Sequence, residues 1–356
     1  FVNQVMLLKG PYKASVYGIV PLAALSKEGR AKGTVTDQMA LTMTLDHANL
    51  SILPMMTKEV SWAAGDTKGK IKIGGTLYEP LVDGQILIQD GTIKLKSLGQ
   101  PLQKVAVDIQ FADDTININT FSGSMGGGSY SLTGKAGWKG LAMSDYALEL
   151  TLDKLGIDHR YFKGPLQGNM RLTQKNGKAL LAGQLLFENT TIDIPLVPEF
   201  QNSELDLALD LDFVAGKKVR LYNSYLYDIL VEGRAKFTGT VARPETAGRF
   251  NALRGTVSYL RTPFTIKDAF IDFTQFRSFI PVIHLEASTR LESTRVNLGI
   301  HGPMQAMEMK LTAEPSMRQQ DIMSLLTLRS RYFDKNRSGN SVKDSGLGRE
   351  ELIGLL

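Results

Sequence analysis

The sequence predicts an all-β protein built mainly from antiparallel strands, with one or two short helices near its C-terminal end. Three observations predict it. Apolar and polar residues alternate through most of the 356-residue chain, turn-forming residues separate the alternating runs, and one strand–turn–strand unit recurs. Because successive side chains of a strand point to opposite faces, each run presents one apolar and one polar face.

The alternation is strictest at residues 205–213, where four leucines and a phenylalanine are separated by aspartate and alanine. Residues 105–111 and 146–152 show the same period of two. We expect tight turns where glycine follows a small or polar residue. These turn signals are Asp83-Gly84, Asp90-Gly91, Asn176-Gly177 and the run Gly126-Gly127-Gly128.

An internal repeat supports an extended sheet. Residues 75–80 and 239–244 both read Gly-Thr, three variable positions, then Pro, and at the same offset Gly84 matches Gly248. A partial third copy begins at Gly183. The spacing between copies is unequal, which argues against a propeller and favours a sheet that grows along one axis. The alternative, that separate β-meanders share turn chemistry by chance, stays open.

A sheet with one apolar face must cover that face or use it. About 20 to 25 strands at roughly 4.8 Å each, folded along their length, would enclose a trough on the order of 100 Å long. Such a trough suits acyl chains, whereas a second sheet would make a filled sandwich, and the period alone does not separate the two. The candidate lining residues are Ile86, Ile88, Ile93, Leu95, Val105, Val107, Ile109, Phe111, Ile116, Ile118, Leu148, Leu150, Leu152, Leu205, Leu207, Leu209, Leu211, Phe213, Ile271, Phe273, Ile283 and Leu285.

A helical pattern occurs near the end of the chain. Ser316 and Gln319 have the spacing of a capping box, and Ile322, Leu325 and Leu326 then fall on one helix face. We therefore expect three parts. These are an elongated β region at 1–315, an amphipathic helix at 316–333, and a polar linker followed by the start of a further, truncated helix at 334–356.

The composition excludes several classes of protein. Hydrophobic and charged fractions of 43% and 22% exclude a collagenous or wholly disordered chain. The lack of Cys excludes a disulfide scaffold, a thiol nucleophile and an iron–sulfur cluster. No stretch approaches the roughly 18 to 20 apolar residues of a membrane-spanning helix. The net charge of +5 comes without a dense basic block, so no nucleic-acid partner is expected.

We expect no catalysis, metal site or cofactor. The four His residues are scattered, and the glycine-rich run at 122–128 lacks the Gly-Lys-Ser/Thr ending of a phosphate loop. The aspartates within 206–212 lack the loop of a calcium site, so a solvated strand face is the better interpretation. The basic cluster at 217–220 is expected in a solvated turn, with a lipid-headgroup contact as the alternative.

An ordered series of segments resembles the C-terminal part of the TamB family, within the AsmA-like group of the bridge-like lipid transfer superfamily. The segments are Gly-Gly-Thr-Leu-Tyr-Glu-Pro at 74–80, Asp-Gly-Thr-Ile at 90–93, the stretches 255–266 and 271–273, and the helical 320–326. The resemblance implies a β-taco, a long curled sheet with a hydrophobic inner groove. It also implies a periplasmic protein, anchored in the inner membrane of a diderm bacterium, that partners a BamA-type (TamA-like) outer-membrane barrel.

Two departures from the family pattern affect these expectations. The N-terminal anchor is absent, so we expect the chain to be a piece of a longer protein, and no residue here is assigned to contact with the barrel. The family is linked to phospholipid transport and to outer-membrane protein assembly. The leading hypothesis is therefore a non-catalytic groove that carries phospholipid acyl chains between the two membranes. The alternatives are an assembly scaffold that holds strands by β-augmentation and a structural repeat protein with a dry, filled core.

Overall fold

The computed structural model describes residues 2–327 except 10–11, 21–37, 51–53, 55–56, 77–78, 140–141, 160, 176, 194–206 and 274–279. Within this part the strands are β1 (Val2–Lys9), β2 (Tyr12–Ile19), β3 (Ala40–Asn49), β4 (Val60–Gly75), β5 (Pro80–Leu95), β6 (Leu102–Ala112), β7 (Thr115–Met125), β8 (Gly128–Lys139), β9 (Ala142–His159), β10 (Phe162–Lys175), β11 (Lys178–Phe187), β12 (Thr191–Ile192), β13 (Leu207–Asn223), β14 (Tyr227–Thr240), β15 (Arg243–Tyr259), β16 (Thr262–Phe273), β17 (Val282–Leu291), β18 (Thr294–Pro303) and β19 (Glu308–Glu314).

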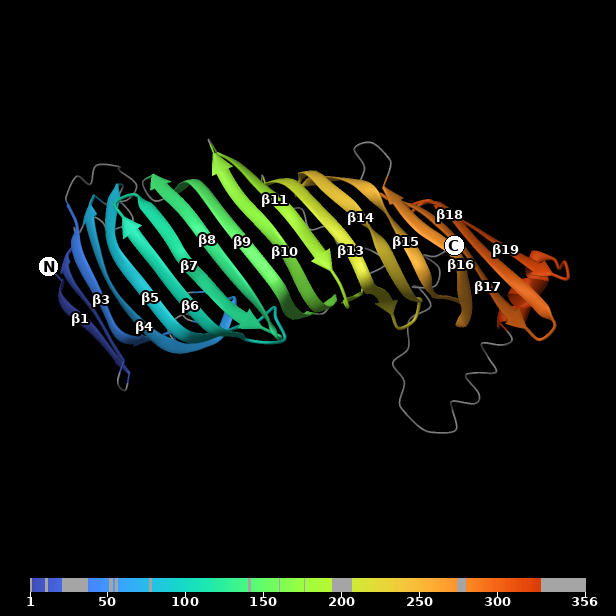
Figure 1. The fold of residues 1–356 in the computed structure, drawn as a ribbon, viewed down its shortest axis with the longest axis horizontal. Coiled ribbons are helices and arrows are strands. Elements are labelled where there is room, and N and C mark those ends of the chain that lie inside the picture. Colours follow the sequence, from blue (N-terminus) through green and yellow to red (C-terminus); the bar gives the residue numbers. More distant parts are fainter. Residues whose placement is uncertain are drawn as a thin grey trace.

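All these strands belong to one sheet, and each strand pairs with its neighbours in the chain (Figure 1). The pairs are antiparallel, except that β13 lies parallel to β11 and β12. At about 4.8 Å between neighbouring strands, the sheet runs for roughly 80 Å from β1 to β19. The predicted class, an elongated and curled antiparallel sheet, is confirmed.

The cross-strand register explains why the alternating runs share a face. Ile86 of β5 lies opposite Ile109 of β6, which in turn lies opposite Ile118 of β7. Leu150 of β9 lies opposite Met170 of β10. Because partners across a ladder point to the same side, the apolar positions of neighbouring strands merge into one continuous surface, here called the inner face.

Two of the predicted turns are wrong. Asp83-Gly84 and Asp90-Gly91 both lie inside β5, which runs unbroken from Pro80 to Leu95. Gly84 has φ +145°, and a Cβ built on it would lie 2.0 Å from the carbonyl oxygen of Lys70 on β4. A glycine in this conformation bends the strand without ending it. The second signal fails for a related reason, because the ladder between β5 and β6 is irregular around Gly91.

The repeat seen in the sequence is therefore a repeated bend. Gly248, the counterpart of Gly84, has φ +144°, and its Cβ would lie 2.3 Å from the carbonyl oxygen of Arg234. Gly183 of the partial copy has φ +147°. Glycines with φ from +140° to +147° recur between β2 and β15, at Gly18, Gly65, Gly84, Gly134, Gly164, Gly183, Gly233 and Gly248. This series of bends accounts for the curl of the sheet.

The other turn signals are confirmed where the structure describes them. Gly126 and Gly127, with φ of +58° and +89°, form the two-residue connection between Met125 and Gly128. Gly177 has φ +75° in the turn that joins β10 to β11, while Asn176 lies outside the described residues.

A helix covers the inner face at the β16–β19 end. It spans residues 319–327, and its Ile322 and Leu326 are fully buried against these strands. The helix begins later than the capping-box prediction, because the carbonyl of Arg318 accepts the backbone N–H of Ile322. The remainder of the predicted helix, 328–333, and the predicted linker and further helix at 334–356 lie outside the described residues.

Candidate functional site

The inner face is the candidate functional site. All but one of the predicted lining residues lie in described strands, with side chains on this face; Leu205 lies outside the described residues. Apolar clusters follow the face along the sheet: one around Val105, one around Leu152, one around Val219, and one beneath helix 319–327.

Most of the lining residues are only partly covered. Those that are buried are Ile93, Val105, Val107, Leu152, Leu211 and Leu285. Those that keep partial exposure are Ile86, Ile88, Leu95, Ile109, Phe111, Ile116, Ile118, Leu148, Leu150, Leu207, Leu209, Phe213, Ile271, Phe273 and Ile283. In a filled sandwich a second sheet would bury these positions, and the described residues contain a single sheet. The inner face is thus a partly covered apolar surface.

The local cover that does exist comes from connections between strands. Leu50, just after β3, is buried among Val60, Ala63 and Val105. Leu98, in the connection from β5 to β6, packs beside the cluster that holds Leu152. The sequence gave no period-two signal for these residues, because they lie outside the strands.

An apolar cavity of about 240 Å³ lies on the inner face over β13 to β18. Three predicted residues, Ile271, Ile283 and Leu285, line it. The lining residues that were not predicted include Leu221, Tyr227, Ile229, Val231, Phe250, Ala252, Val257, Ile300, Met304 and Met307. Alternation of apolar residues at 227–231 could have indicated β14, whereas Met304 and Met307 belong to a turn that the period does not report.

Four phenylalanines form a strip across the middle of the inner face. The ring of Phe187 stacks on that of Phe213 with centroids 5.7 Å apart, and Phe237 meets Phe213 edge-on at 4.6 Å. Phe162 lies 5.7 Å from Phe187 on the other side. Only Phe213 was predicted as a lining residue. Large rings with few rotatable bonds make this part of the face flat and stiff.

Burial changes the chemistry of one polar group on this face. The side chain of Tyr130 packs with Met125 and Leu152, and burial raises the pKa of its hydroxyl to about 12. The phenol therefore stays neutral at any physiological pH. The inner face in this region is a desolvated environment that disfavours charge.

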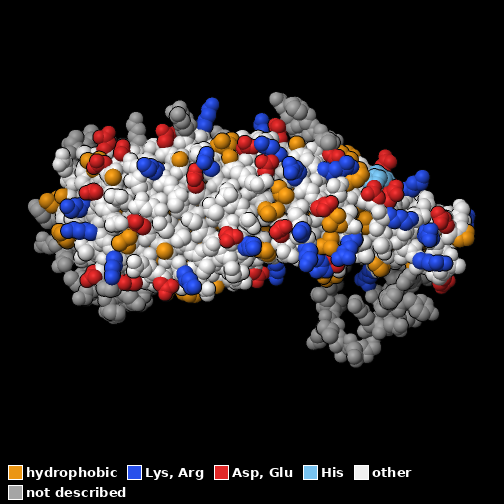
Figure 2. All heavy atoms as spheres, viewed as in Figure 1, with side chains coloured by type: hydrophobic (Ala, Val, Ile, Leu, Met, Phe, Trp, Pro, Cys, Tyr) orange, Lys and Arg blue, Asp and Glu red, His pale blue; other side chains and the backbone are white. Residues whose placement is uncertain are grey.

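The opposite side of the sheet, here called the outer face, is polar. Charged side chains of both signs are spread over the long face seen in Figure 2, with apolar side chains in scattered patches. Cross-strand ion pairs include Arg171 with Glu149 at 2.6 Å and Lys236 with Asp210 at 2.8 Å. Exposed pairs of this kind add little stability, so their main effect is to keep this face in water.

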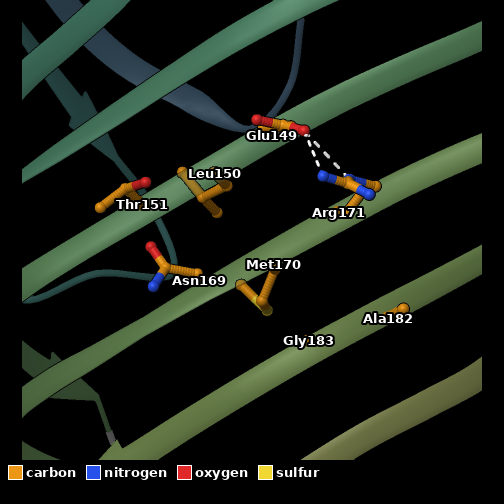
Figure 3. A pocket seen from close by; sticks show the side chains of 8 residues that line it. All are labelled: Glu149, Leu150, Thr151, Asn169, Met170, Arg171, Ala182 and Gly183. Carbon is orange, nitrogen blue, oxygen red and sulfur yellow. Dashed lines mark hydrogen bonds and ion pairs between the residues drawn. The ribbon is translucent and has the colours of Figure 1, made fainter.

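A hollow on the outer face lies over β9, β10 and β11. Figure 3 shows it, with Glu149 and Arg171 joined across one side and Ala182 beside them. Its volume is about 370 Å³, and its polar side chains also include Thr151 and Asn169. The hollow follows from small residues, since Ala182 and Gly183 leave β11 low beside the longer side chains of β10.

The basic cluster at 217–220 does not lie in a turn. It lies inside β13, where the ladder to β14 is irregular between Ala215 and Val219. Lys217 and Lys218 are exposed there, and the extra residue of a β-bulge explains the φ of +57° at Lys218.

Arg220, the last residue of that cluster, is paired. Its Nε and Nη2 donate to the two carboxylate oxygens of Asp228, each at 2.6 Å. These bonds hold the pKa of Asp228 below its ordinary value. The guanidinium also lies 4.4 Å from the centre of the Tyr222 ring.

Two histidines that are far apart in the sequence are partners in space. His284 and His301 lie opposite each other on β17 and β18, with their Nδ1 atoms 3.0 Å apart. The two-residue turn at 292–293 fixes this register and could have revealed the pair. The Nε2 of His284 lies 3.2 Å from Asp268. Even so, no group of three or more metal-ligating side chains occurs in the part of the chain that the structure describes.

Residues 118–356, well over half of the chain, match the family model for the TamB C-terminal domain. The chain belongs to the TamB family. It is similar to the translocation and assembly module subunit TamB of Haemophilus influenzae, with 23% identity over 357 residues. That match covers 89% of this chain and 27% of the relative, so the chain spans about a quarter of the relative's length. No solved structure matches the chain.

The TamB match and the geometry agree on the kind of site. The described helices include none with the length and apolar character needed to cross a membrane. What the described strands offer is a long apolar surface on one side and a charged surface on the other.

Proposed function

We propose that the chain is part of a non-catalytic periplasmic protein whose inner face carries phospholipid acyl chains between the inner and outer membranes. One observation carries the proposal: the apolar inner face is continuous along the described sheet and only partly covered. A surface of this kind is normally buried in a water-soluble protein, and an exposed one marks a binding site.

Acyl chains suit this surface physically. Each buried methylene contributes about 0.8 kcal/mol, so tails bind to a lined groove without specific contacts. Neighbouring strands present similar side chains, such as Ile109 opposite Ile118. A tail therefore gains a similar free energy at successive positions, which favours movement along the groove. Headgroups stay in water at the edge of the sheet.

The relative supports placement in the cell envelope, because its name describes a subunit of a translocation and assembly module. By that similarity we propose that the parent protein is anchored in the inner membrane and meets a BamA-type barrel through regions outside this chain. We assign none of these contacts to a residue here.

An assembly scaffold is the second candidate. Among the described strands, β19 pairs only with β18, so its other edge offers backbone groups to an added strand. The charged side chains Glu308, Lys310 and Glu314 alternate along β19 and are exposed. Such charges are typical of edges that avoid uncontrolled pairing, so we favour the groove over the edge as the functional surface.

Photocrosslinking in bacterial cells tests the proposal. Benzoylphenylalanine replaces Leu209 or Ile118 on the inner face, and in matched controls it replaces their outer-face neighbours Ala208 or Asn117. We expect phospholipid adducts at the inner positions and few at the outer ones, detected by mass spectrometry. Adducts to outer-membrane protein strands would instead favour the scaffold, and equal lipid yields on both faces would exclude the groove.

A charged substitution gives the matching loss of function. Leu209→Asp places a carboxylate on the inner face and should lower the amount of co-purified phospholipid several-fold, because an ionised group is costly to desolvate. Ala208→Asp adds the same charge to the outer face of the same strand and should leave the lipid content unchanged. Equal loss in both variants would contradict a face-specific site.

A further inference from the structure

Helix 319–327 occupies the inner face at the β16–β19 end of the sheet. Ile322 and Leu326 have no exposed surface, and they pack against Phe264 of β16, Leu298 of β18 and Leu311 of β19. These strand residues are themselves buried and hold the same inner-face positions that line the open part of the sheet.

The apolar cavity ends where the helix begins. Val257 and Ile300 line the cavity and also pack against the cluster beneath the helix. Along β18, Ile300 faces the cavity while Leu298, two residues earlier on the same face, lies under the helix. An acyl chain that extends beyond the cavity in this direction would need the surface that Ile322 and Leu326 now cover.

The helix is held mainly by contacts that a lipid tail could replace. Its nine residues are too few to be stable as an isolated helix, so its conformation depends on burying one apolar face. The Tyr259 hydroxyl lies 3.7 Å from the sulfur of Met323, a weak polar contact at the same seat. On the exposed side, the hydroxyl of Ser324 donates to the carbonyl of Gln320 in the same helix.

We infer that helix 319–327 is an internal competitor for acyl chains, a displaceable plug that occupies the β16–β19 end of the groove. The inference rests on the proposed lipid function and adds to it a place where lipid movement is gated. Lipid tails bind freely up to the cavity, and they reach Leu298 and Leu311 only when the helix leaves its seat.

A phospholipid with a photoactivatable diazirine in its tail tests this. The purified full chain is loaded with the probe, irradiated, and digested for mapping of adducts by mass spectrometry. In the wild type we expect adducts near Ile283 and few at Leu298 or Leu311. The double variant Ile322→Asp/Leu326→Asp should raise the yield at Leu298 and Leu311 by about tenfold, the change given by roughly 1.4 kcal/mol. Ser324→Asp, with the same charge on the exposed side, should match the wild type.

The converse experiment fixes the helix in place. The chain has no cysteine, so Tyr259→Cys/Met323→Cys supplies the only two thiols, which a short bismaleimide can join. We expect the joined protein to give fewer adducts at Leu298 than the unjoined one. Far-UV circular dichroism checks that each variant keeps its sheet, and Ile322→Ala/Leu326→Ala, expected to act in the same direction, replaces the aspartate pair if that pair unfolds.

The outcomes separate this inference from the proposed function. Equal adduct yields at Leu298 in the wild type and the seat variants, with adducts still present near Ile283, would overturn the plug alone. No change on joining the thiols would do the same. The absence of adducts anywhere on the inner face would overturn both.

Discussion

The middle of the sheet and its β16–β19 end use the same apolar pattern in different ways. In the middle, inner-face residues such as Ile118 and Leu150 are partly exposed, and repeated glycine bends curve the strands around them. At the end, Leu298 and Leu311 are buried beneath helix 319–327. The described strands β16 to β19 have no glycine with φ near +145°. One region is shaped by its backbone and the other by packing.

This contrast shows what alternation specifies. A period of two determines which side chains share a face, but not whether another element covers that face. Leu150 and Leu298 have the same environment in the sequence, each alternating with polar or small residues, and differ only in what lies above them. The contrast therefore predicts that similar substitutions have different consequences in the two regions.

The largest difference should come from matched truncations of leucine. Leu298→Ala leaves a cavity in a closed core and should cost about 3 to 4 kcal/mol in the free energy of unfolding. Leu150→Ala removes a side chain that is already partly in contact with solvent and should cost about 1 to 2 kcal/mol. Urea denaturation followed by circular dichroism measures both. Equal losses would mean that the middle of the sheet is as closed as the end.

The glycine bends give the next largest effect, confined to the middle region. Gly84→Ala should cost about 2 to 3 kcal/mol, because its φ of +145° is a glycine conformation and the new Cβ would meet the carbonyl oxygen of Lys70. Gly127→Ala is the control, since its Cβ meets no atom within 4 Å and only the strain of positive φ remains.

Thermal unfolding and small-angle scattering check this prediction together. A Gly84 variant that folds should be less curved as well as less stable, while Gly127→Ala should keep the shape of the wild type. If Gly84→Ala left both the melting temperature and the scattering profile unchanged, the sheet would owe its curl to something other than these bends.

The sequence was sufficient for the fold class and for the lining residues, since local alternation carries that information. It was misleading at Gly84 and Gly91, because a glycine after aspartate signals a turn and a bend equally well. It did not show the cover from Leu50 or the His284–His301 pair, because these depend on contacts between segments distant in the chain. The cavity needed the same long-range information, combining three predicted residues with others from turns and neighbouring strands.

The smallest expected effect lies on the outer face, where neither bends nor helix packing operate. The bond from Arg220 lowers the pKa of Asp228, so the carboxylate is favoured in the folded state. Its contribution to stability is present above the ordinary carboxyl pKa of about 3.9 and is lost as the pH falls through the lower folded value. Both side chains are more than a third exposed, which limits the contribution to under about 1 kcal/mol.

Asp228→Asn should therefore lower the melting temperature slightly at pH 7, and the difference from the wild type should shrink below about pH 4. The double variant Arg220→Gln/Asp228→Asn completes a mutant cycle that isolates the coupling between the two side chains. A difference that stayed constant down to pH 2 would show that Asp228 acts through packing rather than through its charge. A small, pH-dependent coupling on the outer face, beside losses of several kcal/mol at Leu298, would place the stability of this protein on its inner face.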